Sequence, residues 1–233
     1  MKQKYSIRHR VERTKNKHSR AVYRDGTIVI RLANGLSKNE EKEHIHDLLE
    51  RMKEQVEEEQ EKILIDPFKK MLDGTETLTV NLATGKRYQF ILKPGKRTRV
   101  VRTLRGWKIY IAPAVRRKAL HRLLWKTLSQ AEHKRIAELV HSVNADTYGV
   151  ALSQVKLQFA STQWGSCSPR GVIMINTALL FVQPSILKYV IIHELAHRKR
   201  ADHSPQYWEW VEWALPSYKR TRAELQECRL PTL

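Results

Sequence analysis

The most regular hydrophobic pattern in the chain lies between Pro184 and His197. Its apolar residues recur at intervals of three and four positions, which places them on one stripe of a helix. They are Ile186, Leu187, Val190, Ile191 and Leu195. Proline suits the first turn of a helix, because the N–H group that it lacks would have no partner there. The pattern predicts a helix that begins near residue 184 and has one buried stripe.

Apolar and β-branched residues form short runs in the first half of the chain, as they do in strands. Strands are predicted at residues 27–32, 77–82, 87–92, 99–104 and 107–111, the last four as two hairpins, and again at 155–160 and 172–175. Helical spacing predicts helices at residues 39–62, 113–144, 205–216 and 217–228. An α+β protein is therefore expected, with a β-rich N-terminal portion at residues 1–112 and a second portion at 113–233.

Two histidines lie near the end of this predicted helix. His193 and His197 are four positions apart, so both imidazoles project from the same face and can bind one ion. Glu194 follows the first histidine, and in the H-E-x-x-H pattern this carboxylate reaches a metal-bound water without being a ligand. The candidates for a third ligand are His203, Glu209 and Glu212.

The alternative for this motif is an amphipathic helix whose two histidines are solvated or hydrogen-bonded within the core. The apolar run before His193 argues against exposure, and burial of an imidazole without a partner costs free energy. A metal site is therefore the favoured interpretation. Histidines on the other predicted helices, His121 among them, are expected to face solvent.

Composition excludes several classes of protein. No run of 18 or more apolar residues is present, so the sequence predicts no membrane-spanning helix. The stretch from Met1 to Tyr5 is basic but lacks the apolar region of a secretory signal. Only two cysteines, Cys167 and Cys228, are present, which does not indicate a disulfide framework. A cytoplasmic protein is expected.

The charge of the chain is high and unevenly distributed. Lys and Arg number 43 against 24 acidic residues, which gives a formal net charge of +19. Residues 77–131 hold 14 Lys and Arg and no acid, whereas ten acids lie between Glu40 and Glu61. Such asymmetry predicts attraction to a polyanion, and nucleic acid is the first candidate. The alternative is a solvated surface that only keeps the protein soluble.

Residues around the H-E-x-x-H motif extend it to a family pattern. They are Trp164-Gly165-Ser166-Cys167, Gly171, Ile175-Asn176, Tyr189-Val190, Asp202-His203-Ser204 and Tyr207-Trp208. Together with the motif they resemble the YgjP-like metallopeptidases, bacterial and archaeal relatives of the SprT-like and WLM proteases. The match is dense from about Trp164 to Trp208 and looser elsewhere.

The resemblance implies a compact zincin-like domain after the β-rich N-terminal portion, with one zinc ion (Zn²⁺) as cofactor. It implies His193, His197 and His203 as zinc ligands and Glu194 as the catalytic carboxylate. The spacing of the last two histidines also fits the metzincin motif, but Arg200 stands where that motif has glycine, and no Met-turn sequence follows. A metzincin assignment is therefore disfavoured.

Three neutral imidazoles leave a zinc ion with an open position, which is the pattern of a catalytic site. Glu194 is then expected to act as general base on the zinc-activated water and to return a proton to the leaving amine. Tyr207 and Tyr218 are candidates for stabilising the oxyanion.

A zincin substrate commonly pairs with an edge strand beside the metal helix. The strand Val172-Ile173-Met174-Ile175 is the candidate here, with Trp164 and Asn176 at the border of the cleft. The alternatives are structural: Trp164 as a core residue and Asn176 as a turn former. Cys167 is expected to be a buried thiol, with an inhibitory zinc thiolate as the alternative.

The leading hypothesis is a zinc-dependent metallopeptidase that hydrolyses peptides or proteins. The competing hypothesis is a nucleic-acid-binding module whose zinc motif is vestigial or structural. A combination of the two, a protease held on DNA by the basic region at residues 77–131, is also considered.

Overall fold

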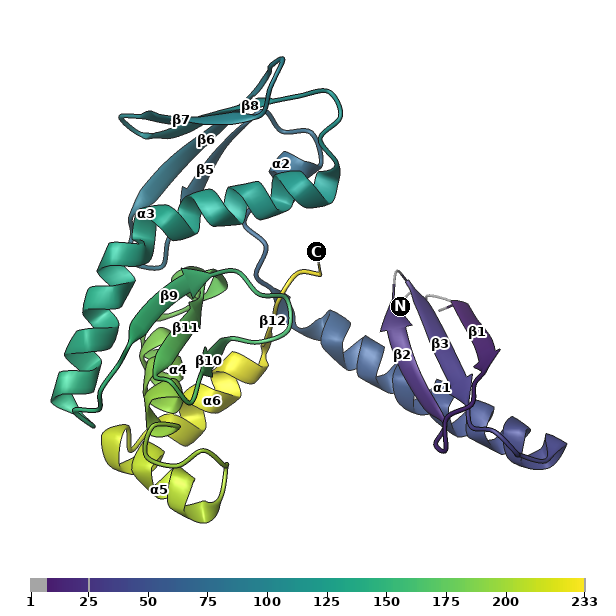
Figure 1. The fold of residues 1–233 in the computed structure, drawn as a ribbon. Coiled ribbons are helices and arrows are strands. Elements are labelled where there is room, and N and C mark those ends of the chain that lie inside the picture. The colour runs from purple at the N-terminus through teal and green to yellow at the C-terminus, as the bar shows by residue number, and fades with distance from the viewer. Residues whose placement is uncertain (1–7, 25, 233) are drawn as a thin grey trace. The chain divides into compact units, whose positions relative to one another are not determined.

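The computed structural model describes residues 8–24 and 26–232 (Figure 1). The described residues form two compact units, with the division between residues 63 and 64. The boundary expected between residues 112 and 113 falls inside the second unit, because the strands before it and the helix after it share one hydrophobic core. No helix of the described residues combines the length and the apolar character needed to cross a bilayer.

The first unit is a three-stranded sheet packed on one long helix. Its strands are β1 (Arg8–Arg13), β2 (Arg20–Arg24) and β3 (Thr27–Leu32), in the order β1-β3-β2. α1 (Lys38–Glu61) begins with a capping box, in which Ser37 and Glu40 bond each other's backbone N–H. Ile28, Ile30 and Leu32 are fully buried beneath the apolar stripe of α1.

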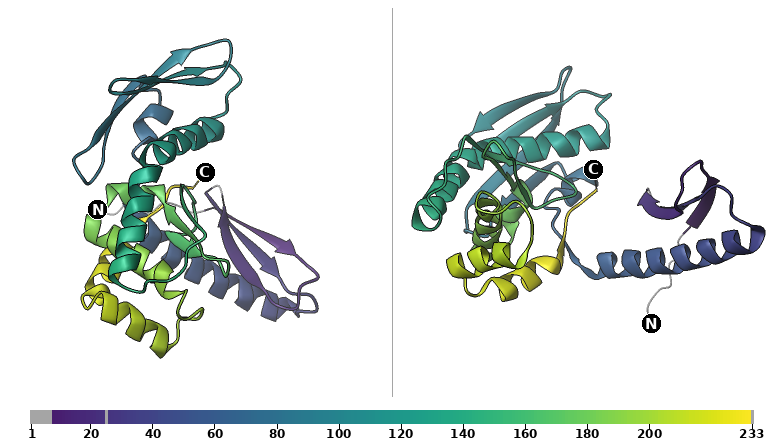
Figure 2. Two further views of the ribbon diagram at one scale, coloured as in Figure 1. Left: turned by 60° about the vertical axis from the view of Figure 1, so that its left-hand side comes forward. Right: turned by 60° about the horizontal axis from the view of Figure 1, so that its bottom comes forward.

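The second unit begins with a four-stranded sheet in the order β5-β6-β8-β7. Its strands are β5 (Thr77–Asn81), β6 (Arg87–Pro94), β7 (Arg99–Thr103) and β8 (Gly106–Ile111). Both predicted hairpins are confirmed, and a parallel pairing of β6 with β8 joins them into one sheet. The short helix α2 (Lys69–Leu72) and the long helix α3 (Arg117–Asp146) lie on the same side of this sheet (Figures 1 and 2).

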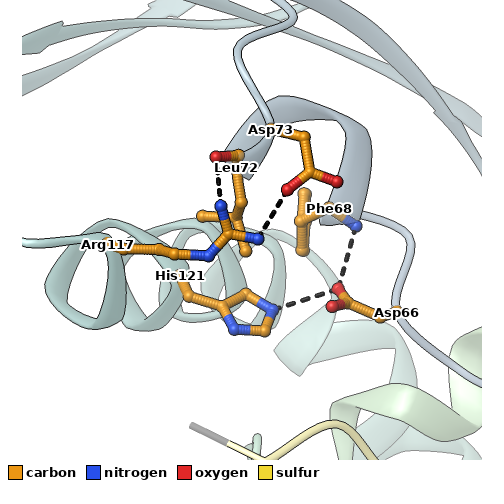
Figure 3. Close-up of polar contacts among 6 residues, drawn as sticks. All are labelled: Asp66, Phe68, Leu72, Asp73, Arg117 and His121. Atoms are coloured by element: carbon orange, nitrogen blue, oxygen red, sulfur yellow. Dashed lines mark hydrogen bonds and ion pairs between the residues drawn. The ribbon is translucent and has the colours of Figure 1, made fainter.

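Polar side chains attach the segment around α2 to the start of α3 (Figure 3). Asp66 Oδ1 lies 3.0 Å from His121 Nε2 and accepts a hydrogen bond from Phe68 N at 3.2 Å. Arg117 Nη2 donates to Asp73 Oδ1 at 2.7 Å. The expectation that His121 faces solvent is therefore wrong: it is buried, and Asp66 supplies a partner from a segment 55 residues away.

A second sheet lies further along α3 and has the order β10-β11-β9. It comprises β9 (Gln154–Gln158), β10 (Gly165–Cys167) and β11 (Val172–Asn176), followed by a 3₁₀ turn, η1 (Thr177–Phe181). The helix predicted to begin near residue 184 is α4 (Pro184–Ala196), and α5 (Pro205–Ala214) and α6 (Tyr218–Gln226) follow it. The short strands β4 (Ile63–Leu64) and β12 (Cys228–Arg229) pair with each other. Nearly every residue of α4 from Ile186 onward is buried, so the sheet and helices hold it from all sides.

Candidate metal centre

The end of α4 brings three imidazoles together. α4 presents His193, its C-cap is His197, and a turn with a hydrogen bond from Arg200 N to Ala196 O (2.9 Å) reverses the chain. The reversal returns His203 to the same place, where its Nε2 lies 3.3 Å from His193 Nε2. One nitrogen from each of the three histidines lies within 4.8 Å of the others, so together they can hold a metal ion.

The surroundings of His193 and His197 favour the neutral form of these two imidazoles. Burial, with the charges of the other two histidines and Arg222, lowers the pKa of His193 to about 3. Burial and the neighbouring His203 also lower the pKa of His197, although hydrogen bonds to the backbone of Arg200 and Ala201 act in the opposite direction. A neutral imidazole has a free lone pair, which is the form that binds a metal.

Tyr207 contacts all three histidines. Its ring lies 4.7 Å from the His197 ring and 4.8 Å from the His203 ring, centroid to centroid, and its hydroxyl donates to His193 O at 2.9 Å. The side chain is fully buried, and burial raises the pKa of the phenol. Because this hydroxyl is already committed to a backbone carbonyl, Tyr207 positions the histidines and is not placed to donate to an oxyanion.

The second tyrosine candidate, Tyr218, is separated from the histidines by the ring of Trp208. Tyr218, on α6, is buried and stacks on Trp208, with ring centroids 5.4 Å apart and 14° between the planes. Trp208 in turn stacks on His203 with centroids 5.8 Å apart. The Arg222 guanidinium lies 4.8 Å from the centroid of the Trp208 ring. Tyr218 is therefore linked to His203 through Trp208, and no ring contact joins it to a histidine in the part of the chain that the structure describes.

Glu194 follows His193 in α4, and its side chain packs against Gly165 of strand β10. Its side chain is buried, and burial raises the pKa of the carboxyl to about 8. Among the described residues it has no hydrogen-bonding or ion-pair partner. A Cβ added at Gly165 would lie only 2.5 Å from Glu194 Oε1, so the absent side chain is what leaves room for this carboxylate. A buried carboxyl without a partner is costly unless a cation or water stands beside it.

The strand proposed to receive a substrate is not an edge strand. Residues Val172, Ile173, Met174 and Ile175 lie in β11, which pairs with β9 on one side and β10 on the other. Its backbone is therefore paired on both sides, and the residues from Ile173 onward are buried. The edge strand next to Glu194 is β10, whose three residues are too short a run to show a strand pattern in the sequence.

Asn176 has the structural role that was the alternative for it. Its amide donates to Ala160 O and Gln163 O, both at 2.7 Å, and its Oδ1 accepts from Ala178 N at 3.0 Å. The side chain is completely buried. Asn176 therefore stabilises the loop before β10 and does not line a cleft. Trp164, on that loop, is partly buried against the hydrophobic core.

The remaining candidates lie apart from the three imidazoles. Glu209 and Glu212 are exposed on α5, and Glu212 lies 3.5 Å from Lys219 Nζ. Cys167 is partly buried, and burial together with the Glu194 charge raises the pKa of its thiol. The protonated form of the thiol is thereby favoured over a metal-binding thiolate.

Sequence reasoning did not assign roles to three residues that complete the centre: Gly165, Trp208 and Arg222. Gly165 was a usable signal, since a glycine in a strand often marks a close approach of the backbone to a side chain. The stacking of Trp208 on His203 and the position of Arg222 depend on how α5 and α6 fold back on α4, which has no local signature.

Comparison with known proteins gives the family of the chain. The model of the YgjP-like, metallopeptidase domain family matches residues 16–228. The crystal structure of the metallopeptidase zymogen of Pyrococcus abyssi abylysin is similar at 23% identity over 41% of this chain and 99% of that one, with a TM-score of 0.37. No curated protein matches the chain. The family match covers nearly the whole sequence and includes all the histidines described above, and the chain therefore belongs to the YgjP-like family of metallopeptidases.

Proposed function

We propose that this protein is a zinc-dependent peptidase whose zinc ligands are His193, His197 and His203 and whose general base is Glu194. The observation that supports this most strongly is the meeting of three imidazoles at the end of α4, where the residue after His193 is a buried carboxylate with no partner in the described residues. Family membership supports the same class of reaction, because metallopeptidases use a metal ion to cleave peptide bonds.

The donor set favours zinc. Nitrogen ligands bind zinc at about 2.0–2.1 Å, so two of them in a tetrahedral site lie roughly 3.3–3.4 Å apart. The distance of 3.3 Å between His193 Nε2 and His203 Nε2 agrees with that value. Two facing imidazole nitrogens this close also need a shared cation or proton between them, since two lone pairs repel each other.

A bound zinc ion supplies Lewis acidity and lowers the pKa of a water molecule to about 7. Glu194 accepts the proton of the attacking water and later returns it to the leaving amine nitrogen. Its pKa of about 8 belongs to a buried carboxyl with no cation nearby, and a cation within roughly 4–6 Å favours the ionised form. Tyr207 keeps the histidines in place during these steps through its bond to His193 O.

The peptide substrate is proposed to pair with the free edge of β10. β11 donates to Trp164 O, and Ser168 N donates to β11, both at 2.9 Å. In an antiparallel pair alternate residues face the partner strand, so the N–H and C=O groups of Gly165 and Cys167 point away from β11. An extended peptide bound there would lie along Glu194, because Gly165 contacts that side chain.

Gly165→Ala is expected to reduce kcat/KM for peptide cleavage by about 100-fold, since misplacing a catalytic group by about 1 Å has an effect of that size. The new Cβ would overlap Glu194 Oε1, and Glu194 is not among the residues that converge as metal ligands. Zinc content is therefore expected to stay at the wild-type level. Cleavage kinetics and metal analysis of the same preparations measure both quantities.

Ser166→Ala is the matched control, because the side chains of neighbouring strand residues point to opposite faces. It removes a hydroxyl on the same strand without approaching Glu194 and is expected to retain activity. Wild-type activity in Gly165→Ala would contradict the contact between β10 and the catalytic carboxylate.

The proposed function is tested by metal analysis of the purified protein together with cleavage of a broad peptide library. One equivalent of zinc and cleavage that stops with a chelator and returns with added zinc are the expected results. Bound zinc without any cleavage, with or without added DNA, would favour the competing hypothesis of a binding module with a structural metal site.

A further inference from the structure

The four-stranded sheet of the second unit has one covered face and one open face. α2 and α3 lie on one side of the sheet (Figures 1 and 2). The buried residues Phe90, Trp107 and Ile109 share a hydrophobic core with residues of both helices, so they face that side. Side chains alternate between the two faces along each strand. The residues between the buried ones, such as Lys108, therefore point away from the helices and into solvent.

The open face carries a cluster of positive charge, here called the basic sheet face. It consists of Arg87, Lys93, Lys96, Arg97, Arg99 and Lys108, all exposed, from strands β6, β7 and β8 and the loop between β6 and β7. No acidic residue occurs between positions 77 and 131. Among the described residues, the one carboxylate that contacts this cluster is Glu76, at 3.8 Å from Lys93 Nζ. The charge of the basic sheet face is therefore largely uncompensated within the protein.

The strand pairing arranges part of this charge in a row. Lys93 and Arg99 are the direct neighbours of Tyr110 on either side, and the Arg99 guanidinium lies 4.3 Å from the centroid of the Tyr110 ring. Adjacent strands are about 4.8 Å apart, so the two backbone positions are separated by roughly 10 Å. The charge is thus spread along a surface, which suits a repeating polyanion better than a single small anion.

Lys86, in the same region of the sequence, has a structural role that the cations of the basic sheet face do not have. Its Nζ donates to Glu132 on α3 at 2.8 Å, and Tyr88 and Arg135 bond the same buried carboxylate. This cation attaches the turn before β6 to α3 and already has a carboxylate partner. The cations of the basic sheet face have no such carboxylate from α3, so the fold does not explain them.

We propose that the basic sheet face binds the phosphate backbone of a nucleic acid without reading its sequence. Lys and Arg neutralise phosphates, and uncharged polar side chains on the same face, such as Thr79 and Gln89, can donate hydrogen bonds to phosphate oxygens. The one aromatic ring of the row, Tyr110, is already stacked with Arg99, so base stacking does not contribute the main affinity. This proposal is independent of the metal centre and its chemistry.

The test compares binding of a short labelled DNA duplex by the wild type and by the triple variant Lys93→Glu, Arg99→Glu, Lys108→Glu. The matched control is Lys134→Glu, Lys156→Glu, Lys188→Glu, which reverses three exposed cations of the same unit elsewhere and changes the net charge equally. Fluorescence anisotropy over a series of salt concentrations measures affinity. Zinc content and circular dichroism of all three proteins check that they are folded.

The wild type is expected to bind with a log–log salt slope of about −0.9 per phosphate neutralised. The basic-face variant should bind about tenfold or more weakly with a correspondingly shallower slope, while the control retains most of the affinity. Equal losses in both variants would reduce the effect to net charge and overturn the proposal. Absence of binding by the wild type at low salt, or equally tight binding to poly-glutamate or to anionic vesicles, would overturn it as well.

Discussion

Glu194→Gln is expected to lower peptidase activity by about 10²–10⁴-fold, the usual contribution of general acid–base catalysis, and to leave the fold and the metal in place. The amide is nearly the same size as the carboxyl but cannot accept the proton of the attacking water at neutral pH. Glu194 is not among the residues whose nitrogen or oxygen atoms converge as metal ligands, so zinc content should not change. Cleavage kinetics and metal analysis of the two proteins, purified side by side, measure the effect.

The substitution also separates chemistry from binding. Affinity for the DNA duplex should be the same in wild type and Glu194→Gln. Glu194 lies in α4, whereas the basic sheet face consists of residues from β6, β7, β8 and the loop between β6 and β7. A DNA-bound but inactive variant would support two independent functional surfaces. Equal cleavage by wild type and Glu194→Gln would mean that another group is the base or that a contaminating enzyme is the source of the activity.

The second large effect is expected from His203→Ala, which should lose most of its zinc, as should His193→Ala and His197→Ala. Each removes one of three ligand nitrogens and leaves two, too few for a stable site of this type. A ligand at 100 times its Kd stabilises the folded state by about 2.7 kcal/mol, so added zinc should raise the thermal stability of the wild type and not that of these variants. Calorimetric unfolding with and without zinc measures the difference.

His141→Ala is the matched control, since His141 is an exposed histidine on α3. It is expected to bind zinc and respond to it as the wild type does. Full zinc occupancy in His203→Ala would remove that residue from the ligand set and direct attention to the carboxylates of α5, Glu209 and Glu212.

The sequence by itself determined the local features of this protein. The spacing of His193 and His197 needs only one turn of helix to bring both imidazoles to one face, and the apolar stripe of α4 specified that helix. The hairpins β5-β6 and β7-β8 likewise follow from two apolar runs on either side of a turn. These features depend on residues close together in the chain, so the spacing of apolar and polar residues predicts them directly.

Tertiary structure alone decided how distant segments meet. It made β11 a central strand and β10 the edge, buried His121 against Asp66, and placed Gly165 against Glu194. It also gave Lys86 a different role from the cations of the basic sheet face. Lys86 has the same charge and lies in the same stretch of sequence, but it bonds Glu132. Such outcomes depend on which strand pairs with which and on the partner each polar group finds across the fold. Neither is encoded in the periodicity of a single segment, because pairing and burial are settled by contacts between residues far apart in the chain.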